Sequence, residues 1–375
     1  MSDPANSRPE TAERRASALL AAAARAAHDR SSYGGVTVAG LVQPETSRLS
    51  EVERLAMRGM FVGLIETIEN ELRARLLASS ELPDSPEFRA SMGAAHVAIA
   101  WPILANAGMP EDSELIDTLI RHARAYSVTR QLRRAGVISE DGRLDMLTDA
   151  DDAAIAASAM KLLIAESRFN DRFEDPRLGR SDLPDGVDRR LVWTVAAALR
   201  DYGERVHRLD GSILDFCMAK AARQMLDDHG EDRPIEVTAM ALAAHLKTKG
   251  LVDSALLIEA LNGARLALYI AMLAVRAGMA FDIVWDMAIN ADAPSHMIIL
   301  KSIGIERDAA SHLLTAMTRA VLSDQAKADA RAVNWIESYD ALSADDIEAA
   351  MRSWRLDSVY RGALARFSSV GLEAR

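Results

Sequence analysis

The chain has 375 residues, of which 49% are hydrophobic and 26% charged, and it carries a formal net charge of -11. That composition is ordinary for a folded protein, and the length is enough for at least one substantial core. Because the chain as a whole repels a phosphate backbone, we expect no nucleic-acid partner. The single cysteine, Cys217, excludes an intramolecular disulfide and fits a reducing compartment, so we expect a cytoplasmic protein.

The first segment, residues 1–48, is predicted to be a disordered leader followed by an Ala-rich helix. The leader covers residues 1–9 and the helix runs from Glu10 to His28. Paired arginines before a short apolar run resemble a secretory or twin-arginine signal. However, the run is mostly Ala, and Arg25 interrupts it before any credible cleavage site. A helix is therefore the preferred interpretation.

The next part of the chain predicts a series of short helices. Ser50 and Glu53 form an S-x-x-E capping box ahead of a helix that should reach about Leu77. Ser85 and Pro86 start another one. Further helices are predicted over residues 94–108, with Pro102 inside, and over 111–123, 126–136, 151–166 and, after a Pro-Asp-Gly turn, about 187–206.

The second half continues in the same way. Helices are predicted over residues 211–230, 234–250, 253–263, 266–275, 280–289, 294–304, 306–322 and 343–367. In the last of these, Ser343 and Asp346 form an S-x-x-D box.

One stretch, "LALYIAMLAV" at residues 266–275, contains no charge. As a helix it rises only about 15 Å, half of the roughly 30 Å of bilayer hydrocarbon, so it cannot span a membrane alone. It is apolar on two sides, which indicates burial between neighbours. We therefore predict a central buried helix, bounded by breaks at Gly263 and Gly278.

The fold class that these patterns predict is all-α, because no segment alternates like a strand. Short, paired helices without a strict repeat suggest a HEAT-like, α-solenoid-like N-terminal part packed with a second helical C-terminal part. A compact irregular helical domain is the competing interpretation. The predicted divisions are a HEAT-like region at residues 49–205, a C-terminal helical domain at 206–325 and a helical extension at 326–375.

Four stretches carry a resemblance to a known family, at residues 48–77, 97–120, 180–202 and 245–289. They resemble an alphaproteobacterial family that is defined as a domain of unknown function, with HEAT-like helical repeats, and the likeness extends over roughly residues 15–320. Members often carry an acidic residue before the apolar helix, where this chain has "NGAR", residues 262–265. The resemblance implies a fold and assigns no catalytic residue.

Motifs for chemistry are missing from the sequence. It has no G-x-S-x-G, Walker A, G-x-G-x-x-G or H-E-x-x-H pattern, so we expect no enzyme, no cofactor and no metal. The nearest metal-like pair is Glu204 and His207, but a di-iron bundle needs two such motifs and two further Glu. Cys217 is predicted to be an inert core thiol. His96 and His245 are predicted to be structural residues held by hydrogen bonds.

Two charged segments remain. The "DDHGED" run at residues 227–232 reads as an exposed acidic loop, with weak Mg²⁺ or Ca²⁺ binding as the alternative. A second segment collects five arginines without an acid, which are Arg121, Arg124, Arg130, Arg133 and Arg134. They form either a solvated helix face or a patch that binds an anion or an acidic partner.

The leading functional hypothesis is a non-enzymatic protein-interaction scaffold or regulatory adaptor with an unidentified protein partner. The alternative is a sensor that binds a small molecule or nucleotide in a groove between the helical halves. A third and more remote hypothesis is a HEAT-like enzyme that acts on nucleic acid. No membrane span is expected, and a homodimer is left open.

Overall fold

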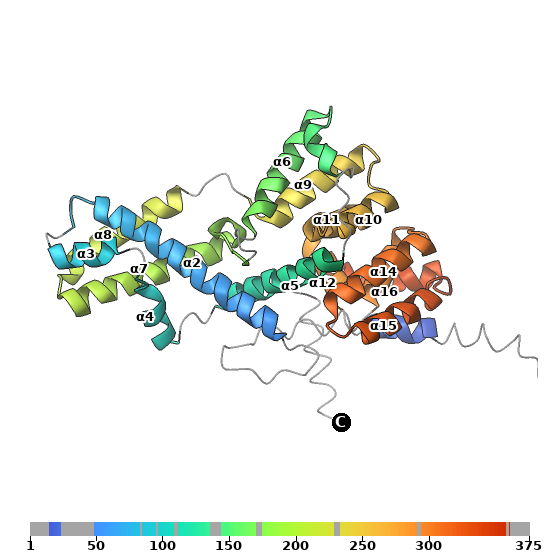
Figure 1. Cartoon of the computed structure of the whole chain (residues 1–375), viewed down its shortest axis with the longest axis horizontal. Helices are drawn as coiled ribbons and strands as arrows, with labels where there is room; N and C mark the ends of the chain where they lie inside the picture. Colours follow the sequence, from blue (N-terminus) through green and yellow to red (C-terminus); the bar gives the residue numbers. More distant parts are fainter. Residues whose placement is uncertain are drawn as a thin grey trace, which may run out of the picture.

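The computed structural model describes residues 15–23, 49–82, 85–94, 97–108, 112–135, 144–169, 175–228, 233–290, 294–357 and 360 (Figure 1). Over these residues the chain forms helices and no strand, which confirms the all-α prediction. The predicted disordered leader, His96, most of the acidic "DDHGED" run and the end of the predicted C-terminal helix lie outside the described residues.

The helices follow one another with short connections. The N-terminal ones are α2 (Glu51–Ala78), α3 (Pro86–Gly93), α4 (Ala100–Asn106) and α5 (Ser113–Ala135), followed by a 3₁₀ turn η3 (Asp145–Asp149). Next come α6 (Ala153–Arg168), a 3₁₀ turn η4 (Arg180–Asp182), α7 (Asp185–His207) and α8 (Gly211–Asp227). The remainder are α9 (Ile235–Thr248), α10 (Ser254–Asn262), α11 (Leu266–Ala277), α12 (Phe281–Ile289), α13 (Ser295–Ser302), α14 (Arg307–Val321), α15 (Gln325–Ser338) and α16 (Ala344–Trp354).

The predicted helix starts are confirmed where the sequence provides a cap. At α2, the Glu53 amide donates to the Ser50 hydroxyl over 3.2 Å, and the Ser50 amide donates to the Glu53 carboxylate over 2.6 Å. This reciprocal bonding satisfies two amides that the helix itself leaves unpaired. Ser343 likewise accepts a hydrogen bond from the Asp346 amide at the start of α16.

Some predicted boundaries were wrong. The helix expected over residues 343–367 ends at Trp354, and α15 was not predicted. The apolar helix expected from residue 94 begins only at Ala100, because the buried Glu69 carboxylate of α2 accepts the amides of both Ile99 and Ala100 over 2.9 Å and so caps the helix there. Pro102 then falls in the first turn, where its missing N–H costs nothing. The two helices expected at 111–123 and 126–136 are the single helix α5.

The reason why α5 looks like two helices is that its apolar stripe changes sides. The buried residues of its first half are Leu115, Leu119 and Ala123, and those of its second half are Val128 and Leu132. At about 100° per residue, these two sets lie on roughly opposite faces. They also belong to different cores, so α5 passes from one part of the molecule to the other (Figure 1).

The buried residues form two clusters. The first core draws on α2, α3, α4, the first half of α5, α7 and α8. The second core draws on the second half of α5, α6 and α9–α16, together with Ala16 and Ala23 of the helix at residues 15–23. Because α6 joins the second core although it precedes α7 in sequence, the chain crosses between the two parts more than once. The division at residues 205 and 325 stays a prediction.

The uncharged stretch is the centre of the second core, as predicted. Eight of the twelve residues of α11 are buried, and the helix ends at Gly278, whose φ of 65° is left-handed. Among the described helices no single one is long and apolar enough to cross a membrane. Together, α11 and α12 reach that length, but they are bent by 114° at their junction and most of their residues are buried.

Candidate functional site

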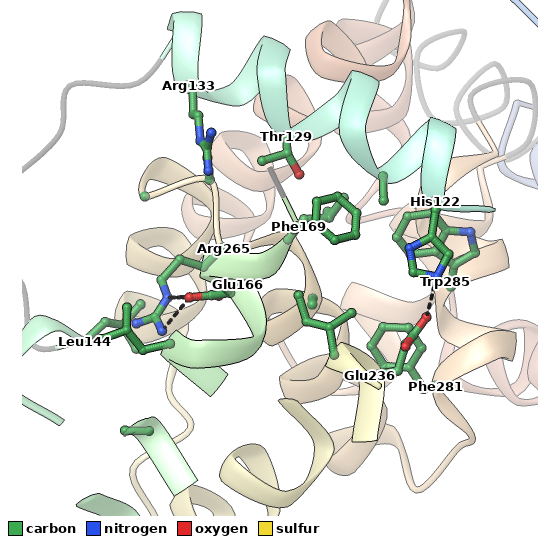
Figure 2. A pocket seen from close by; sticks show the side chains of 18 of the residues that line it. His122, Thr129, Arg133, Leu144, Glu166, Phe169, Glu236, Arg265, Phe281 and Trp285 are labelled. Carbon is green, nitrogen blue, oxygen red and sulfur yellow. Dashed lines mark hydrogen bonds and ion pairs between the residues drawn. The ribbon is translucent and has the colours of Figure 1, made fainter. Parts of the chain in front are cut away.

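A cavity of about 320 Å³ lies where residues 121–133 of α5 meet the second core (Figure 2). Its walls come from α5, η3 and α6, the first turn of α9, the turn before α11, and the start of α12. The cavity has a polar group at each end and an apolar body between them, the usual composition of a small-molecule pocket. Its lining includes Arg121, His122, Thr129, Arg133, Leu163, Glu166, Phe169, Ile235, Glu236, Ala264, Arg265, Ala267, Phe281 and Trp285.

One end of the pocket is formed by a buried histidine, His122, and a partly buried acid, Glu236. His122 is only 3% exposed, and its Nδ1 has no hydrogen-bond partner among the described residues. Its Nε2 lies 3.9 Å from a Glu236 carboxylate oxygen, which is too long for a hydrogen bond. A buried polar atom without a partner costs free energy, so a ligand group that bonds to Nδ1 would recover that cost.

The protonation of this end follows from burial. Burial lowers the pKa of His122 to about 4, although the Asp182 carboxyl nearby acts against that shift. Burial raises the pKa of Glu236 and of Asp182 above the ordinary range for carboxyls. At neutral pH the imidazole is therefore uncharged, and one of its nitrogens accepts while the other donates.

The other end is lined by two arginines, Arg133 and Arg265, and one acid, Glu166 (Figure 2). Arg265 donates hydrogen bonds of 3.0 and 3.2 Å to the Glu166 carboxylate, so the charge of that acid is already neutralised. The Arg133 guanidinium of α5 lines the same end, and Figure 2 shows it on the side of Arg265, away from His122.

The turn before α11 forms part of the wall with consecutive residues, Gly263 to Ala267. No side chain caps the N-terminus of α11, whereas Asp152 and Asp253 cap α6 and α10. The first bond of the helix is the one from the Tyr269 amide to Arg265, which leaves earlier amides without an intrahelical acceptor. Ala264 also has a φ of 55°, a strained left-handed conformation for a residue with a Cβ.

The body of the pocket is apolar. Figure 2 places the Phe169 ring between the two polar ends, and His122 approaches it with ring centroids 5.6 Å apart. The stacked rings of Phe281 and Trp285, with centroids 6.4 Å apart, lie toward the His122 end. The lining thus suits a molecule with a flat or chain-like apolar middle.

The five arginines that the sequence singled out all lie on α5, but they do not share a face. At about 100° per residue, Arg121 and Arg133 fall on the arc that faces the pocket, while Arg130 and Arg134 point to the opposite side. The pocket accordingly includes Arg121 and Arg133, and not Arg124, Arg130 or Arg134. That the five arginines bind an anion or an acidic partner as one surface patch stays a prediction.

The other candidates have structural partners. Glu204 pairs with Arg200, and His207 packs edge-on against Phe88 and Tyr202. Among the described residues, no three His, Cys, Asp or Glu side chains are placed to share a metal ion. Cys217 is buried, which raises the pKa of its thiol, as expected for an inert core cysteine. His245 Nδ1 forms a hydrogen bond of 2.9 Å with the Ser158 hydroxyl, which confirms the prediction that His245 is a hydrogen-bonded structural residue.

Sequence reasoning missed the pocket. The sequence patterns do not single out His122, Phe169 or Glu236 as site residues. One signal was present: the "NGAR" turn lacks an N-cap residue for α11, and its Ala264 and Arg265 both line the cavity.

Comparisons with known proteins add one finding. A family model described as an uncharacterised protein conserved in bacteria (DUF2336) matches residues 137–352, which is more than half of the chain. No curated protein and no solved structure matches the chain. The matched range covers α6 to α15 and most of α16, so it contains most of the pocket and omits the α5 wall.

Proposed function

Because the chain belongs to the DUF2336 family of uncharacterised bacterial proteins, we propose its function from the pocket alone: it is a regulatory protein that binds a small molecule without transforming it. The observation that carries this proposal is the buried His122, which lines a 320 Å³ cavity and whose Nδ1 has no hydrogen-bond partner among the described residues. That volume lies near the lower end of ligand pockets, about 300–1,000 Å³.

Binding is favoured over catalysis by the proton chemistry of the site. A general base works best when its pKa lies near the operating pH, and burial holds the pKa of His122 at about 4. Its nearest acid, Glu236, stands 3.9 Å away and does not orient the ring by a hydrogen bond. A neutral imidazole in this setting recognises a ligand by donating or accepting one hydrogen bond.

Filling the pocket should abolish ligand binding. Ala267 lies in the first turn of α11 and lines the cavity, so Ala267→Trp places an indole in the space that the ligand needs. We expect a thermal-shift screen of bacterial metabolites to identify compounds that stabilise the wild type and leave this variant unaffected. Ala154→Trp, at an exposed position of α6, is the matched control and should respond like the wild type. Equal stabilisation of both proteins, or no stabilising compound at all, would refute the pocket.

The adaptor part of the proposal rests on α6. Three apolar side chains at helical spacing, Met160, Leu163 and Ile164, are each 46–48% exposed, and Leu163 also lines the pocket. A protein partner that docks on this stripe would be adjacent to the ligand.

The HEAT-like character belongs to the same proposal and is supported by consecutive helices that pack together, such as α7 with α8 and α14 with α15. We place the protein in the bacterial cytoplasm, in keeping with its single unpaired cysteine.

A charge on the α6 stripe should remove the partner without unfolding the protein. We expect Ile164→Lys to lose a protein that wild-type bait captures specifically from the native bacterium, with a melting temperature within about 2 °C of wild type, as for most surface substitutions. Val333→Lys on α15, where Val333 is 54% exposed, is the control and should retain the capture. Capture that survives Ile164→Lys unchanged would exclude this surface.

A further inference from the structure

Two polar side chains at one end of the pocket are close together but do not bond to each other. His122 Nε2 and a Glu236 carboxylate oxygen are 3.9 Å apart, which is too far for a direct hydrogen bond. The Nδ1 atom of the same ring has no hydrogen-bond partner among the described residues. Both side chains line the cavity. A single ligand hydroxyl that enters beside them can therefore bond to the imidazole and the carboxyl together.

The charges of the lining are matched, which disfavours a charged ligand. Arg265 and Glu166 are joined by hydrogen bonds. Arg121 attracts the Glu236 carboxyl electrostatically, and Arg133 already takes part in an interaction. A charged ligand would lose its water shell on entry and find its counter-charges engaged, so an uncharged one is favoured.

The rings in the lining favour a flat ligand. The Phe169 ring contacts His122 with centroids 5.6 Å apart, and Phe281 and Trp285 are stacked with an angle of 18° between their planes. Aromatic rings gain from offset or edge-on contact with other rings, beyond the area they bury. A cavity of about 150 Å³ is enough to hold benzene. This cavity, at about 320 Å³, therefore has room for two fused rings.

We propose that the pocket binds an uncharged two-ring aromatic alcohol, whose ring hydroxyl bonds to His122 and Glu236 together and whose rings pack on Phe169, Phe281 and Trp285 (Figure 2). This rests on the proposed small-molecule function and specifies its ligand class. A hydroxyl suits this end of the pocket because its one oxygen both donates and accepts, so it matches either neutral tautomer of the imidazole.

The experiment is a calorimetric titration of the full chain at pH 7 with three probes on the same two-ring skeleton: 2-naphthol, naphthalene and decahydro-2-naphthol. Naphthalene lacks the hydroxyl, whereas decahydro-2-naphthol keeps it on a saturated, puckered skeleton. We expect 2-naphthol to bind at least about tenfold more tightly than naphthalene, which leaves the buried polar groups without a partner. It should bind at least about threefold more tightly than decahydro-2-naphthol, which loses the contacts between rings.

Each comparison tests one part of the proposal. Naphthalene that binds as tightly as 2-naphthol would overturn the hydroxyl contact, and decahydro-2-naphthol that binds as tightly would overturn the aromatic class. If 2-naphthol does not bind up to its solubility limit, the whole inference is wrong.

Two histidines provide matched variants. His122→Leu removes both ring nitrogens and keeps a side chain of similar size, so we expect the advantage of 2-naphthol over naphthalene to fall to within about twofold. Because this variant also removes a buried atom without a partner, its melting temperature should not fall below that of the wild type. His312→Leu is the control, since His312 is exposed on α14, bonds to Asn262 and does not line this cavity. An equal advantage in both variants would show that the hydroxyl does not bond to His122.

A second variant tests the other half of the contact without touching a core side chain. Glu236 lies in the first turn of α9, and its side chain is 21% exposed. We expect Glu236→Met to reduce the advantage of 2-naphthol over naphthalene at least about threefold, because the hydroxyl loses one of its two partners. An unchanged advantage would overturn the contact with Glu236.

Failure of this inference can be told apart from failure of the proposed function. If 2-naphthol does not bind, but Ala267→Trp abolishes the stabilisation by another compound from the thermal-shift screen, only the ligand class is wrong. If Ala267→Trp leaves all binding intact, both proposals fail.

Discussion

Replacing Leu273 by Asp should destabilise the protein by at least about 5 kcal/mol, a large part of the roughly 5–15 kcal/mol that holds a typical domain together. Leu273 is fully buried at the centre of α11, with apolar neighbours from its own helix and from the rest of the second core. The variant loses the burial of a leucine and places a carboxyl group where no partner is available. We expect urea unfolding followed by circular dichroism to show loss of a cooperative transition.

The matched control is the same change at Leu55 of α2, where the side chain is 64% exposed. Leu55→Asp should alter the free energy of unfolding by about 0.5 kcal/mol or less, as is usual at the surface. A folded Leu273→Asp protein with near wild-type cooperativity would show that α11 is not enclosed in this way.

Removal of the buried Glu69 should have the second largest effect, about 3–5 kcal/mol, because it leaves an uncompensated charge in the first core. Glu69 and Arg73 lie one turn apart on α2, 3.2 Å from each other, with side chains that are 2% and 3% exposed. Glu69 also accepts the amides of Ile99 and Ala100, and Arg73 donates to the carbonyls of Ser91 and Ala94. In Glu69→Ala the two amides lose their acceptor and Arg73 loses its counter-charge.

An exposed pair of the same spacing provides the comparison. Asp201 and Arg205 of α7 are 2.7 Å apart, with Arg205 77% exposed. Because such pairs contribute little in water, Asp201→Ala should cost under about 1 kcal/mol by urea unfolding. A similarly small cost for Glu69→Ala would mean that the buried pair does not fasten α2 to α3 and α4.

How much of the fold was predictable depended on local signals. Helix starts with a Ser or Asp cap, such as those at Ser50 and Ser343, could be placed to within a residue or two because the cap chemistry is local. The start of α4 could not, since its cap is Glu69, thirty residues away in sequence. The burial of α11 was evident because apolar residues on all sides leave no face for solvent.

The candidate site was predictable only in fragments. The arginine-rich segment of α5 drew attention for its charge, yet only Arg121 and Arg133 reach the pocket, because residues at other helical angles point elsewhere. His122 and Glu236 are 114 positions apart, and nothing in either local sequence indicates that they meet. Their altered pKa values come from burial that arises only when the chain folds and brings α5 and the start of α9 to the same cavity.

The central claim is that the pocket is a ligand site which His122 completes. The most direct test is nitrogen-15 NMR of the histidine rings, recorded as the wild type is saturated with a compound that stabilises it, with the His122 signals assigned from His122→Gln. We predict that the His122 ring nitrogens shift as Nδ1 gains a partner, while those of His245, already bonded to Ser158, stay in place. Saturation that leaves the His122 signals unmoved would contradict the account.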